Sequence, residues 1–245
     1  MKIGVFDSGL GGITVLKKLR EKYPNNEYVY LADLYNMPFG EKTKEELQVI
    51  AKNIIDKLEE KNVDMYVCAC GTLSSTMLEY MKALTNKKIY GIIDSICSDI
   101  KTDNVLLLAT PATINSKFFE NKIKEKVNNV YTEGCFEFVP IIEKGYNKDI
   151  QCTVDKYIKK YKNKIDTLVL GCTHYILLEK YFRNTLGNDI KIIDASNSTS
   201  NILEKEIKDS TQNLEIIMTK KSDIFLEKTK EILNISEKDF IVLYI

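Results

Sequence analysis

Two cysteines stand in sequence contexts that suit acid–base chemistry. Cys70 lies in Ala-Cys-Gly-Thr and Cys172 lies in Gly-Cys-Thr-His, each at the end of an apolar run. A buried cysteine is most often an inert, small hydrophobic side chain. Small and hydroxyl residues directly after both thiols favour a ligand site instead. The other cysteines, at positions 68, 97, 135 and 152, lack such neighbours and are interpreted as structural.

His174 is the only histidine of the chain and lies two residues beyond Cys172. Histidine changes its charge near neutral pH, and a protonated imidazole beside a thiol raises the fraction of thiolate. We therefore interpret His174 as a proton partner of Cys172.

Two other chemistries are disfavoured by spacing. Four side chains could supply zinc ligands: Cys68, Cys70, Cys172 and His174. Their spacing is Cys-x-Cys and Cys-x-His, without the usual two-residue gap of a zinc-binding loop. A redox disulfide normally uses Cys-x-x-Cys at the start of a helix. We expect neither a metal nor a dithiol reaction.

A glycine-rich loop occupies residues 7–12, Asp-Ser-Gly-Leu-Gly-Gly, between a predicted strand and a predicted helix. It is similar to a dinucleotide-binding fingerprint, but the last glycine of that pattern falls on Thr14. Asp7 would also repel a pyrophosphate. The glycines still predict close approach of the backbone to a ligand, with amides free to hold a carboxylate.

The elements that position these residues alternate along the chain. Apolar, β-branched runs predict strands at 3–7, 28–32, 64–70, 88–93, 104–109, 130–135, 166–171, 190–193, 215–218 and 240–245. Amphipathic patterns predict helices at 13–22, 43–61, 74–84, 113–126, 150–161, 176–184, 198–208 and 222–233. Thr43 and Glu46 form a predicted capping box. Alternation of strands and helices indicates an α/β fold with mainly parallel sheets.

An internal repeat divides the chain into two similar halves. Segments 2–8, 38–42 and 65–70 match 104–110, 140–144 and 167–172 at a shift of 102, and 92–94 recurs as 192–194 at a shift of 100. We predict one α/β domain from 1–94 plus about 195–245, and a second from about 95–194. Ligands bind beyond the carboxyl ends of parallel strands, so the two thiols should face one cleft.

Composition excludes several function classes. Lysine plus arginine and aspartate plus glutamate both total 35, and Arg20 and Arg183 are the only arginines. Such a balanced surface argues against a nucleic-acid partner. No run approaches the roughly 20 apolar residues of a membrane helix. Asp7 interrupts the N-terminal apolar stretch, which argues against a signal peptide. We expect reduced cysteines and a cytoplasmic location.

With these residues assembled, the chain resembles the glutamate racemases of the cofactor-independent aspartate/glutamate racemase superfamily. The similarity runs from Ile3 to about Ser200. Six segments carry it: 6–12 (Phe-Asp-Ser-Gly-Leu-Gly-Gly), Asp33 with 38–40 (Pro-Phe-Gly), 70–72 (Cys-Gly-Thr), 109–113 (Ala-Thr-Pro-Ala-Thr), 139–143 (Val-Pro-Ile-Ile-Glu) and 171–175 (Gly-Cys-Thr-His-Tyr).

The resemblance implies two α/β domains related by a pseudo-twofold axis, with the active site between them. It implies cofactor-independent racemisation, most directly of L-glutamate to D-glutamate for cell-wall peptidoglycan. One thiolate removes the α-proton and the other thiol protonates the opposite face. By the same resemblance, Asp7 assists Cys70, and His174 assists Cys172 with Glu143 nearby. The implied substrate-binding residues are Asp7, Ser8, Phe39, Gly40, Gly71, Thr72, Thr113, Thr173 and His174.

Four positions depart from the pattern of that family. Gly71 replaces an asparagine, Phe39 a tyrosine, Leu34 a threonine and Ile176 a proline. The first two remove donors from the expected substrate site, so other substrates stay open: aspartate, another amino acid, or a dicarboxylate that is isomerised. A paralogue that only binds a small acid is a further alternative. A homodimer is also compatible with the resemblance.

Overall fold

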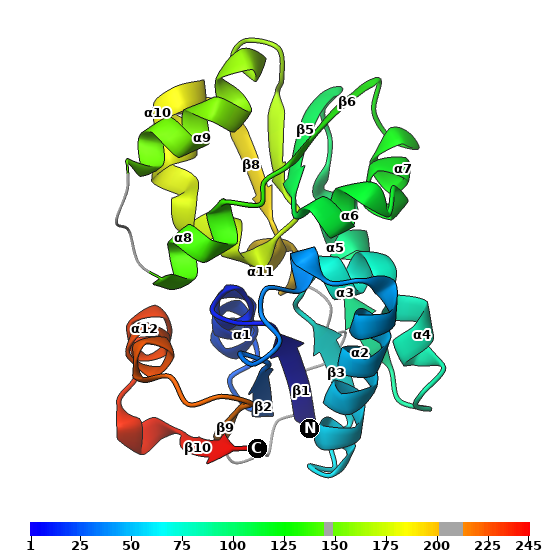
Figure 1. Cartoon of the computed structure of the whole chain (residues 1–245), viewed down its shortest axis with the longest axis vertical. Helices are drawn as coiled ribbons and strands as arrows, with labels where there is room; N and C mark the ends of the chain where they lie inside the picture. Colours follow the sequence, from blue (N-terminus) through cyan, green and yellow to red (C-terminus); the bar gives the residue numbers. More distant parts are fainter. Residues whose placement is uncertain (145–148, 201–212) are drawn as a thin grey trace.

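The computed structural model describes residues 1–144, 149–200 and 213–245. These residues form two lobes, each built on a parallel β-sheet (Figure 1). We call the six-stranded sheet with its helices the first lobe, and the four-stranded sheet with its helices the second lobe. The lobes meet at the carboxyl ends of their central strands, where ligands of α/β proteins bind.

The first sheet has the strand order β10-β9-β2-β1-β3-β4. Its strands are β1 (Lys2–Asp7), β2 (Glu27–Ala32), β3 (Met65–Cys68), β4 (Ile89–Gly91), β9 (Leu214–Met218) and β10 (Ile241–Tyr244). Successive side chains enter opposite cores, as Val5 and Phe6 do. Because helices cover both faces, such strands are nearly continuous apolar runs, which explains why they are visible in the sequence.

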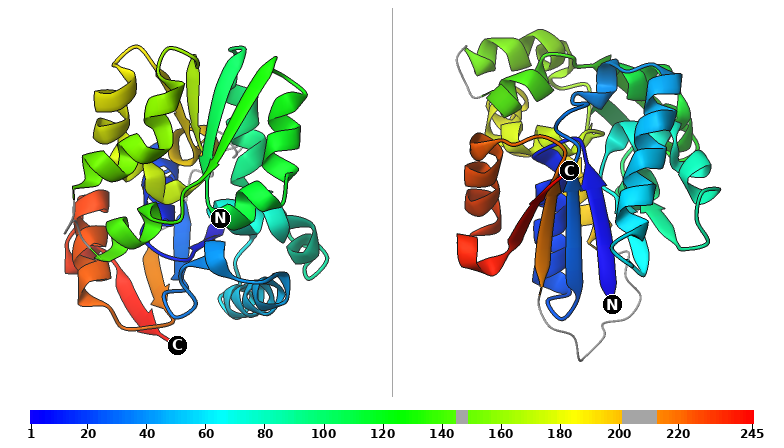
Figure 2. Two further views of the ribbon diagram at one scale, coloured as in Figure 1. Left: turned by 45° about the horizontal axis from the view of Figure 1, so that its top comes forward. Right: turned by 60° about the horizontal axis from the view of Figure 1, so that its bottom comes forward.

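Helices α1 (Gly11–Lys22) and α12 (Asp223–Leu233) lie next to each other on one face of the first sheet (Figure 2). Helix α2 (Lys44–Glu59) covers the other face and packs there with α4 (Leu78–Lys82). Thr43 caps α2: its hydroxyl accepts from the Glu46 amide, and the Glu46 carboxylate accepts from the Thr43 amide. The predicted capping box is confirmed.

The second sheet has the strand order β6-β5-β7-β8. Its strands are β5 (Asn104–Ala109), β6 (Asn129–Gly134), β7 (Thr167–Leu170) and β8 (Lys191–Asp194). The helices α8 (Phe138–Lys144), α9 (Ile150–Ile158) and α10 (Glu179–Leu186) pack on one face. On the other face lie α5 (Ile92–Asp99) and α7 (Phe118–Lys124).

The two sheets repeat one topology. In the first, β2-β1-β3-β4 are neighbours in that order, and in the second, β6-β5-β7-β8 follow the same pattern. The predicted α/β class with parallel sheets is confirmed. The matched segments 2–8 and 104–110 fall on the equivalent strands β1 and β5, and 65–70 and 167–172 fall on β3 and β7. The fourth match is wrong, because 92–94 begins helix α5 while 192–194 lies in strand β8.

The remaining elements refine the predicted boundaries. Residues 88–93 are not one strand: β4 ends at Gly91 and α5 begins at Ile92, because a short apolar run suits a buried helix equally well. The predicted helix 74–84 divides into α3 (Gly71–Thr76) and α4, and 113–126 divides into α6 (Pro111–Asn115) and α7. Short helical turns are η1 (Phe39–Glu41), η2 (Lys159–Tyr161), η3 (Thr173–Leu178) and η4 (Glu237–Asp239).

The predicted helix 198–208 overlaps α11 (Ala195–Thr199), and its part from 201 onward lies outside the described residues. One hydrophobic cluster joins the lobes through α5: it contains Val5 and Leu16 of the first lobe, Ile96 of α5, and Leu107 and Phe119 of the second. Each such buried side chain contributes about 1.5–3 kcal/mol. Within residues 1–144, 149–200 and 213–245, no helix is both long and apolar enough to span a membrane.

Candidate active site

Both singled-out thiols lie at the junction of the lobes. Cys70 follows β3 and precedes α3, and Cys172 follows β7 and precedes η3. Both residues are buried, at 5% and 7% exposure. They line one small cavity between the lobes with a volume of about 20 Å³, which has room for about one water molecule. The repeat thus brings its two strand-end cysteines to a shared site.

Cys70 is accompanied by the carboxylate of Asp7, at the end of β1; we call Cys70, Asp7 and Ser8 the Cys70 arm. The Ser8 amide donates to Asp7 Oδ1 at 2.7 Å. Burial raises the pKa of Asp7, although the charge of His174 and hydrogen bonds from Thr173 and Ser8 oppose it. Burial and the nearby Asp7 charge raise the pKa of Cys70 well above its usual value. This arm therefore disfavours negative charge on both groups.

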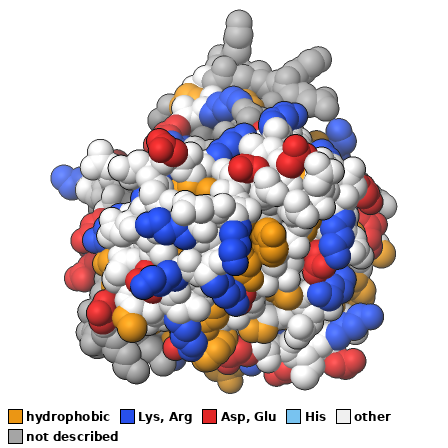
Figure 3. Space-filling model, turned by 90° about the horizontal axis from the view of Figure 1, so that it is seen from above, with side chains coloured by type: hydrophobic (Ala, Val, Ile, Leu, Met, Phe, Trp, Pro, Cys, Tyr) orange, Lys and Arg blue, Asp and Glu red, His pale blue; other side chains and the backbone are white. Residues whose placement is uncertain are grey.

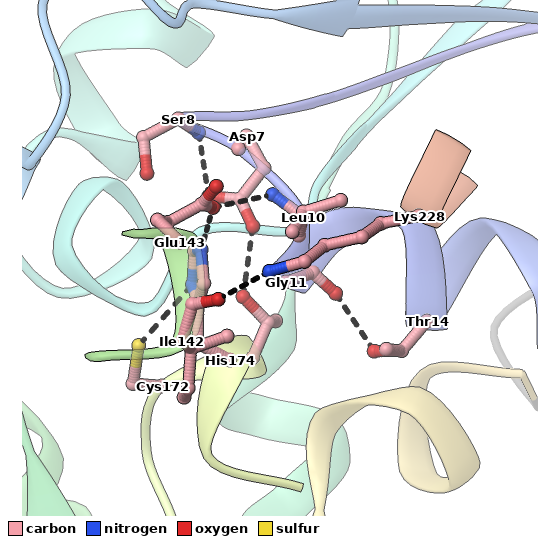
Figure 4. Close-up of polar contacts among 12 residues, drawn as sticks. Asp7, Ser8, Leu10, Gly11, Thr14, Ile142, Glu143, Cys172, His174 and Lys228 are labelled. Carbon is pink, nitrogen blue, oxygen red and sulfur yellow. Dashed lines mark hydrogen bonds and ion pairs between the residues drawn. The ribbon is translucent and has the colours of Figure 1, made fainter. Parts of the chain in front are cut away.

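Cys172 is accompanied by an imidazole and a carboxylate; we call Cys172, His174 and Glu143 the Cys172 arm (Figure 4). The Cys172 sulfur lies 3.8 Å from His174 Nδ1, and His174 Nε2 lies 2.6 Å from Glu143 Oε1. Burial acts to lower the pKa of His174, but its hydrogen bonds to Cys172 and Glu143 raise it well above its usual value. This arm favours an imidazolium.

Glu143 is held from both lobes. Its Oε1 accepts a hydrogen bond of 2.8 Å from the Leu10 amide of the first lobe. The same oxygen contacts His174 of the second lobe. Burial acts to raise the pKa of Glu143, yet these bonds and the positive charges of His174 and Lys228 hold it below its usual value. The glycine-rich loop 7–12 therefore offers the Leu10 amide to a carboxylate, but this carboxylate is the side chain of Glu143 and not a ligand.

Hydroxyl groups link the two lobes beside the cavity. Thr173 Oγ1 donates to Asp7 Oδ2 at 2.8 Å, so a residue next to Cys172 binds the carboxylate next to Cys70. In a second such contact, Thr72 Oγ1 and Thr110 Oγ1 lie 3.0 Å apart. Both contacts join the first lobe to the second, and each hydroxyl can rotate to offer a bond to a ligand oxygen.

Gly71 allows the backbones of the two lobes to approach closely beside the two cysteines. A Cβ atom at this position would lie 2.0 Å from the carbonyl oxygen of Gly171, which cannot move as a flexible side chain could. The site therefore has no room for the asparagine of the resembled family while the lobes keep this separation. The absence of that side chain permits a close contact of the lobes beside Cys70 and Cys172.

The cavity is lined by most of the predicted binding residues: Asp7, Ser8, Phe39, Gly40, Gly71, Thr72, Thr173 and His174. Thr113 and Glu143 do not line it. Thr113 Oγ1 lies 3.0 Å behind Thr110 Oγ1, and Glu143 lies behind His174.

Sequence reasoning assigned no binding role to three further residues of the cavity wall, Pro38, Thr110 and Val139. All three lie in the motif segments 38–40, 109–113 and 139–143, so the motifs carried the signal. Leu34 instead lines a neighbouring cavity of about 320 Å³ with Glu143, and Ile176 is a half-buried residue of η3.

Cys68 lies apart from this chemistry. Burial raises its pKa to about 12, and its sulfur lies 3.6 Å from the Cys70 carbonyl oxygen. A zinc ligand must be a thiolate, which this environment opposes. Among the residues that the structure describes, no group of three or more His, Cys, Asp and Glu side chains is arranged to hold a metal ion.

Comparisons with known proteins identify a family and relatives for this chain. The model of the family described as Asp/Glu/Hydantoin racemase matches residues 10–199. A glutamate racemase of Aquifex aeolicus (strain VF5) is 38% identical over 229 residues, which are 91% of this chain and 90% of the relative.

Solved structures extend the similarity to the whole fold. The glutamate racemase of Aquifex pyrophilus superposes with a TM-score of 0.86 at 35% identity, covering 100% of this chain and 98% of the other. The glutamate racemase of Francisella tularensis subsp. tularensis SCHU S4, solved in complex with D-glutamate, superposes with a TM-score of 0.89 at 26% identity, covering 99% and 97%.

Proposed function

The chain belongs to the Asp/Glu/hydantoin racemase family, and we propose that it interconverts L- and D-glutamate with its two thiols as the acid and the base. The observation that carries this proposal is the placement of Cys70 and Cys172 on opposite lobes, facing one buried cavity. Inversion of a stereocentre needs a base on one side of the α-carbon and an acid on the other. The repeated strand ends supply both.

In one direction, a thiolate removes the α-proton while the opposite thiol donates a proton to the other face. Asp7 serves Cys70, and His174 serves Cys172, as groups that take up or return the thiol proton. Glu143 orients the His174 ring by its bond to Nε2 and compensates the imidazolium charge. The next turnover in the reverse direction exchanges the two roles, which suits a reaction whose substrate and product are mirror images.

Substrate carboxylates and the ammonium group need partners inside the cavity. The hydroxyls of Ser8, Thr72 and Thr173 and the backbone at Gly40 line it and can bind these groups. A substrate ammonium beside Cys70 would favour a thiolate there, because it offsets the charge of Asp7.

Substrate entry requires the lobes to separate. The cavity of about 20 Å³ is far smaller than the roughly 300 Å³ at which small-molecule pockets begin. Interlobe contacts surround it, among them Asp7 with Thr173 and Gly71 with Gly171. We assign this closed arrangement to the water-excluding state in which the proton is transferred.

We propose that the lobes are domains with the boundaries predicted above, although the division after residue 94 falls inside helix α5. The separate sheets support this division.

We expect no nucleic-acid partner, since Lys and Arg side chains mix with Asp and Glu on the face in Figure 3. We also propose a cytoplasmic location, a homodimer and a role in the supply of peptidoglycan precursors. All six cysteines are free, which is typical of a cytoplasmic protein.

The test is to incubate the pure protein with L-glutamate, and separately with D-glutamate, in heavy water without added cofactor. We expect both reactions to converge on equal amounts of the enantiomers, with deuterium at the α-carbon, as measured by chiral chromatography and mass spectrometry. Thiol alkylation should abolish turnover, and bound glutamate should protect. A panel of aspartate and other amino acids is the control. Faster turnover of another amino acid would overturn the glutamate assignment. If no amino acid exchanged its α-proton, the racemase proposal would be wrong, and the protein would be a paralogue that only binds a small acid.

A further inference from the structure

Lys228 of helix α12 reaches across the junction to the other lobe. Its Nζ donates a hydrogen bond of 2.7 Å to the carbonyl oxygen of Ile142 in α8, directly before Glu143 (Figure 4). Lys228 is half-buried. It belongs to the first lobe, whereas α8 belongs to the second, and neither the cavity wall nor the proton-transfer steps include it.

The position of this contact has a physical consequence for α8. Ile142 lies in α8 (Phe138–Lys144), directly before Glu143. A lysine ammonium that binds a backbone carbonyl forms a charge-assisted hydrogen bond, which is stronger than a bond between neutral groups. Lys228 thus holds the backbone of α8 from the opposite lobe, one residue away from Glu143.

Glu143 depends on the same turn of α8. Its carboxylate is bound by Leu10 of the first lobe and by His174 of the second, so small shifts of the turn would disturb both bonds. The charge of Lys228 also contributes to holding the pKa of Glu143 low.

The structure assigns Lys228 as a positioning residue that ties the α8 backbone at Ile142 to the first lobe and so orients Glu143 toward His174 when the site is closed. We call the bond between Lys228 and Ile142 the latch. This inference rests on the proposed racemase function for its kinetic consequence, but the latch itself is independent of that function. Opening of the lobes would break the bond to Ile142, and closure would restore it. Lys228 acts on Cys172 only through Glu143 and His174.

Charged groups around Glu143 define how the latch affects pH dependence. His174 contacts it directly, Tyr30 lies near enough to feel its charge, and Lys220 and Lys221 share with it the neighbouring cavity of about 320 Å³. Removing Lys228 leaves these groups in place. The pKa of Glu143 should then rise, and the acid limb of the rate profile should move to higher pH.

The experiment compares four variants. Lys228→Met removes the donor and the charge, Lys228→Gln keeps a donor, and Lys228→Arg keeps both. Lys230→Met is the matched control: it lies on the same helix, and its Nζ binds Glu237 of the same lobe at 2.9 Å. The measurements are kcat and KM for glutamate, their pH profiles, Tm, and hydrogen–deuterium exchange of residues 138–144 without substrate.

We expect Lys228→Met to lower kcat by roughly ten- to a hundredfold, as a small misplacement near the chemistry does. KM should change less, the acid limb should shift upward, and exchange in 138–144 should accelerate. Lys228→Arg should restore both rate and profile, whereas Lys228→Gln should restore the rate and protection but not the profile.

The latch is overturned if Lys228→Met matches Lys230→Met in kcat and in exchange, or if its loss of activity follows its loss of Tm without rescue by arginine. The exchange comparison needs no turnover. A wild-type protein without racemase activity would therefore refute the proposed function while still allowing the latch to be accepted or rejected.

Discussion

The Cys70 arm and the Cys172 arm occupy equivalent places of the repeat but have unlike partners. A shift of 102 places Cys70 on Cys172, yet it places Asp7 on Ala109 and Thr72 on His174. The Cys70 arm therefore holds a buried carboxylate beside a thiol whose pKa is raised well above its usual value. The Cys172 arm holds an imidazole between the thiol and a carboxylate.

This difference shows that the two thiols, although both transfer a proton, have different electrostatic surroundings. The Cys172 arm contains its own positive charge, the His174 imidazolium, because hydrogen bonds to Cys172 and Glu143 raise the pKa of His174. The Cys70 arm has none of its own, so we expect it to rely on the ammonium group of the substrate. Chemistry that must work from both sides of a carbon does not require symmetric side chains.

The largest expected effect comes from removing either thiol. Cys70→Ser and Cys172→Ser should each lower racemisation by a factor on the order of 100 to 10,000, because a hydroxyl is a far weaker acid than a thiol. Chiral chromatography in both directions measures the loss, and circular dichroism verifies the fold. Turnover close to wild type in one variant would show that the arms are not both required.

The next effect concerns the contact between the lobes. Gly71→Ala should lower kcat/KM by about a hundredfold, because its Cβ would meet the Gly171 carbonyl and hold the lobes apart. Gly71→Asn should be at least as harmful, although it restores the family residue. Gly134→Ala is the control, since its nearest neighbour would be an ordinary contact at 3.5 Å. An active Gly71→Asn enzyme would mean that the lobes need not close this tightly for catalysis.

A third comparison concerns the opposite effects of the Asp7 and Glu143 carboxylates on the stability of the folded protein. Burial raises the pKa of Asp7, so the unfolded chain releases this proton first and stability falls as pH rises above about 3.8. Asp7→Asn should therefore raise Tm at neutral pH while lowering activity. The pKa of Glu143 is lowered, so its charge stabilises the fold above about pH 4.5 and this contribution is lost as pH falls. Glu143→Gln should lower Tm at neutral pH.

Thermal unfolding between about pH 3 and about pH 8 tests both signs: the gain from Asp7→Asn should vanish as pH falls below about 3.8, and the loss from Glu143→Gln should vanish as pH falls below about 4.5. A fall in Tm for Asp7→Asn at neutral pH would contradict a raised pKa for the buried Asp7 carboxylate.

The smallest effect concerns two buried tyrosines that support the arms. Tyr30 Oη donates to the Gly9 carbonyl at 2.6 Å beside the Cys70 arm, and Tyr175 Oη donates to the Cys135 carbonyl at 2.8 Å beside the Cys172 arm. Each change to phenylalanine leaves a buried acceptor without its partner and should cost about 1–3 kcal/mol. Calorimetry should show Tm lower by several degrees. Tyr30→Phe should reduce activity more, because Gly9 lies in the loop that carries Asp7; equal activities would remove that distinction.

Local sequence determined much of this protein. Strands buried on both faces are continuous apolar runs, so the amino-acid pattern alone indicates their positions and the repeat. The residues after two such strands, Cys70 and Cys172, stand out in the sequence for the same reason. Local pattern fails where an apolar run is short: Ile92 and Ile93 begin a helix rather than end a strand, and no predicted helix covers α8.

Tertiary structure alone decided which groups meet. Glu143 binds His174 and Leu10, Thr173 binds Asp7, and Gly71 touches Gly171, and each pair except the first joins the two lobes. Periodicity records which face of an element is buried, but it does not record how one lobe is placed on another. Those contacts depend on the packing of helix α5 and the shared core between the sheets, which no local stretch of sequence contains.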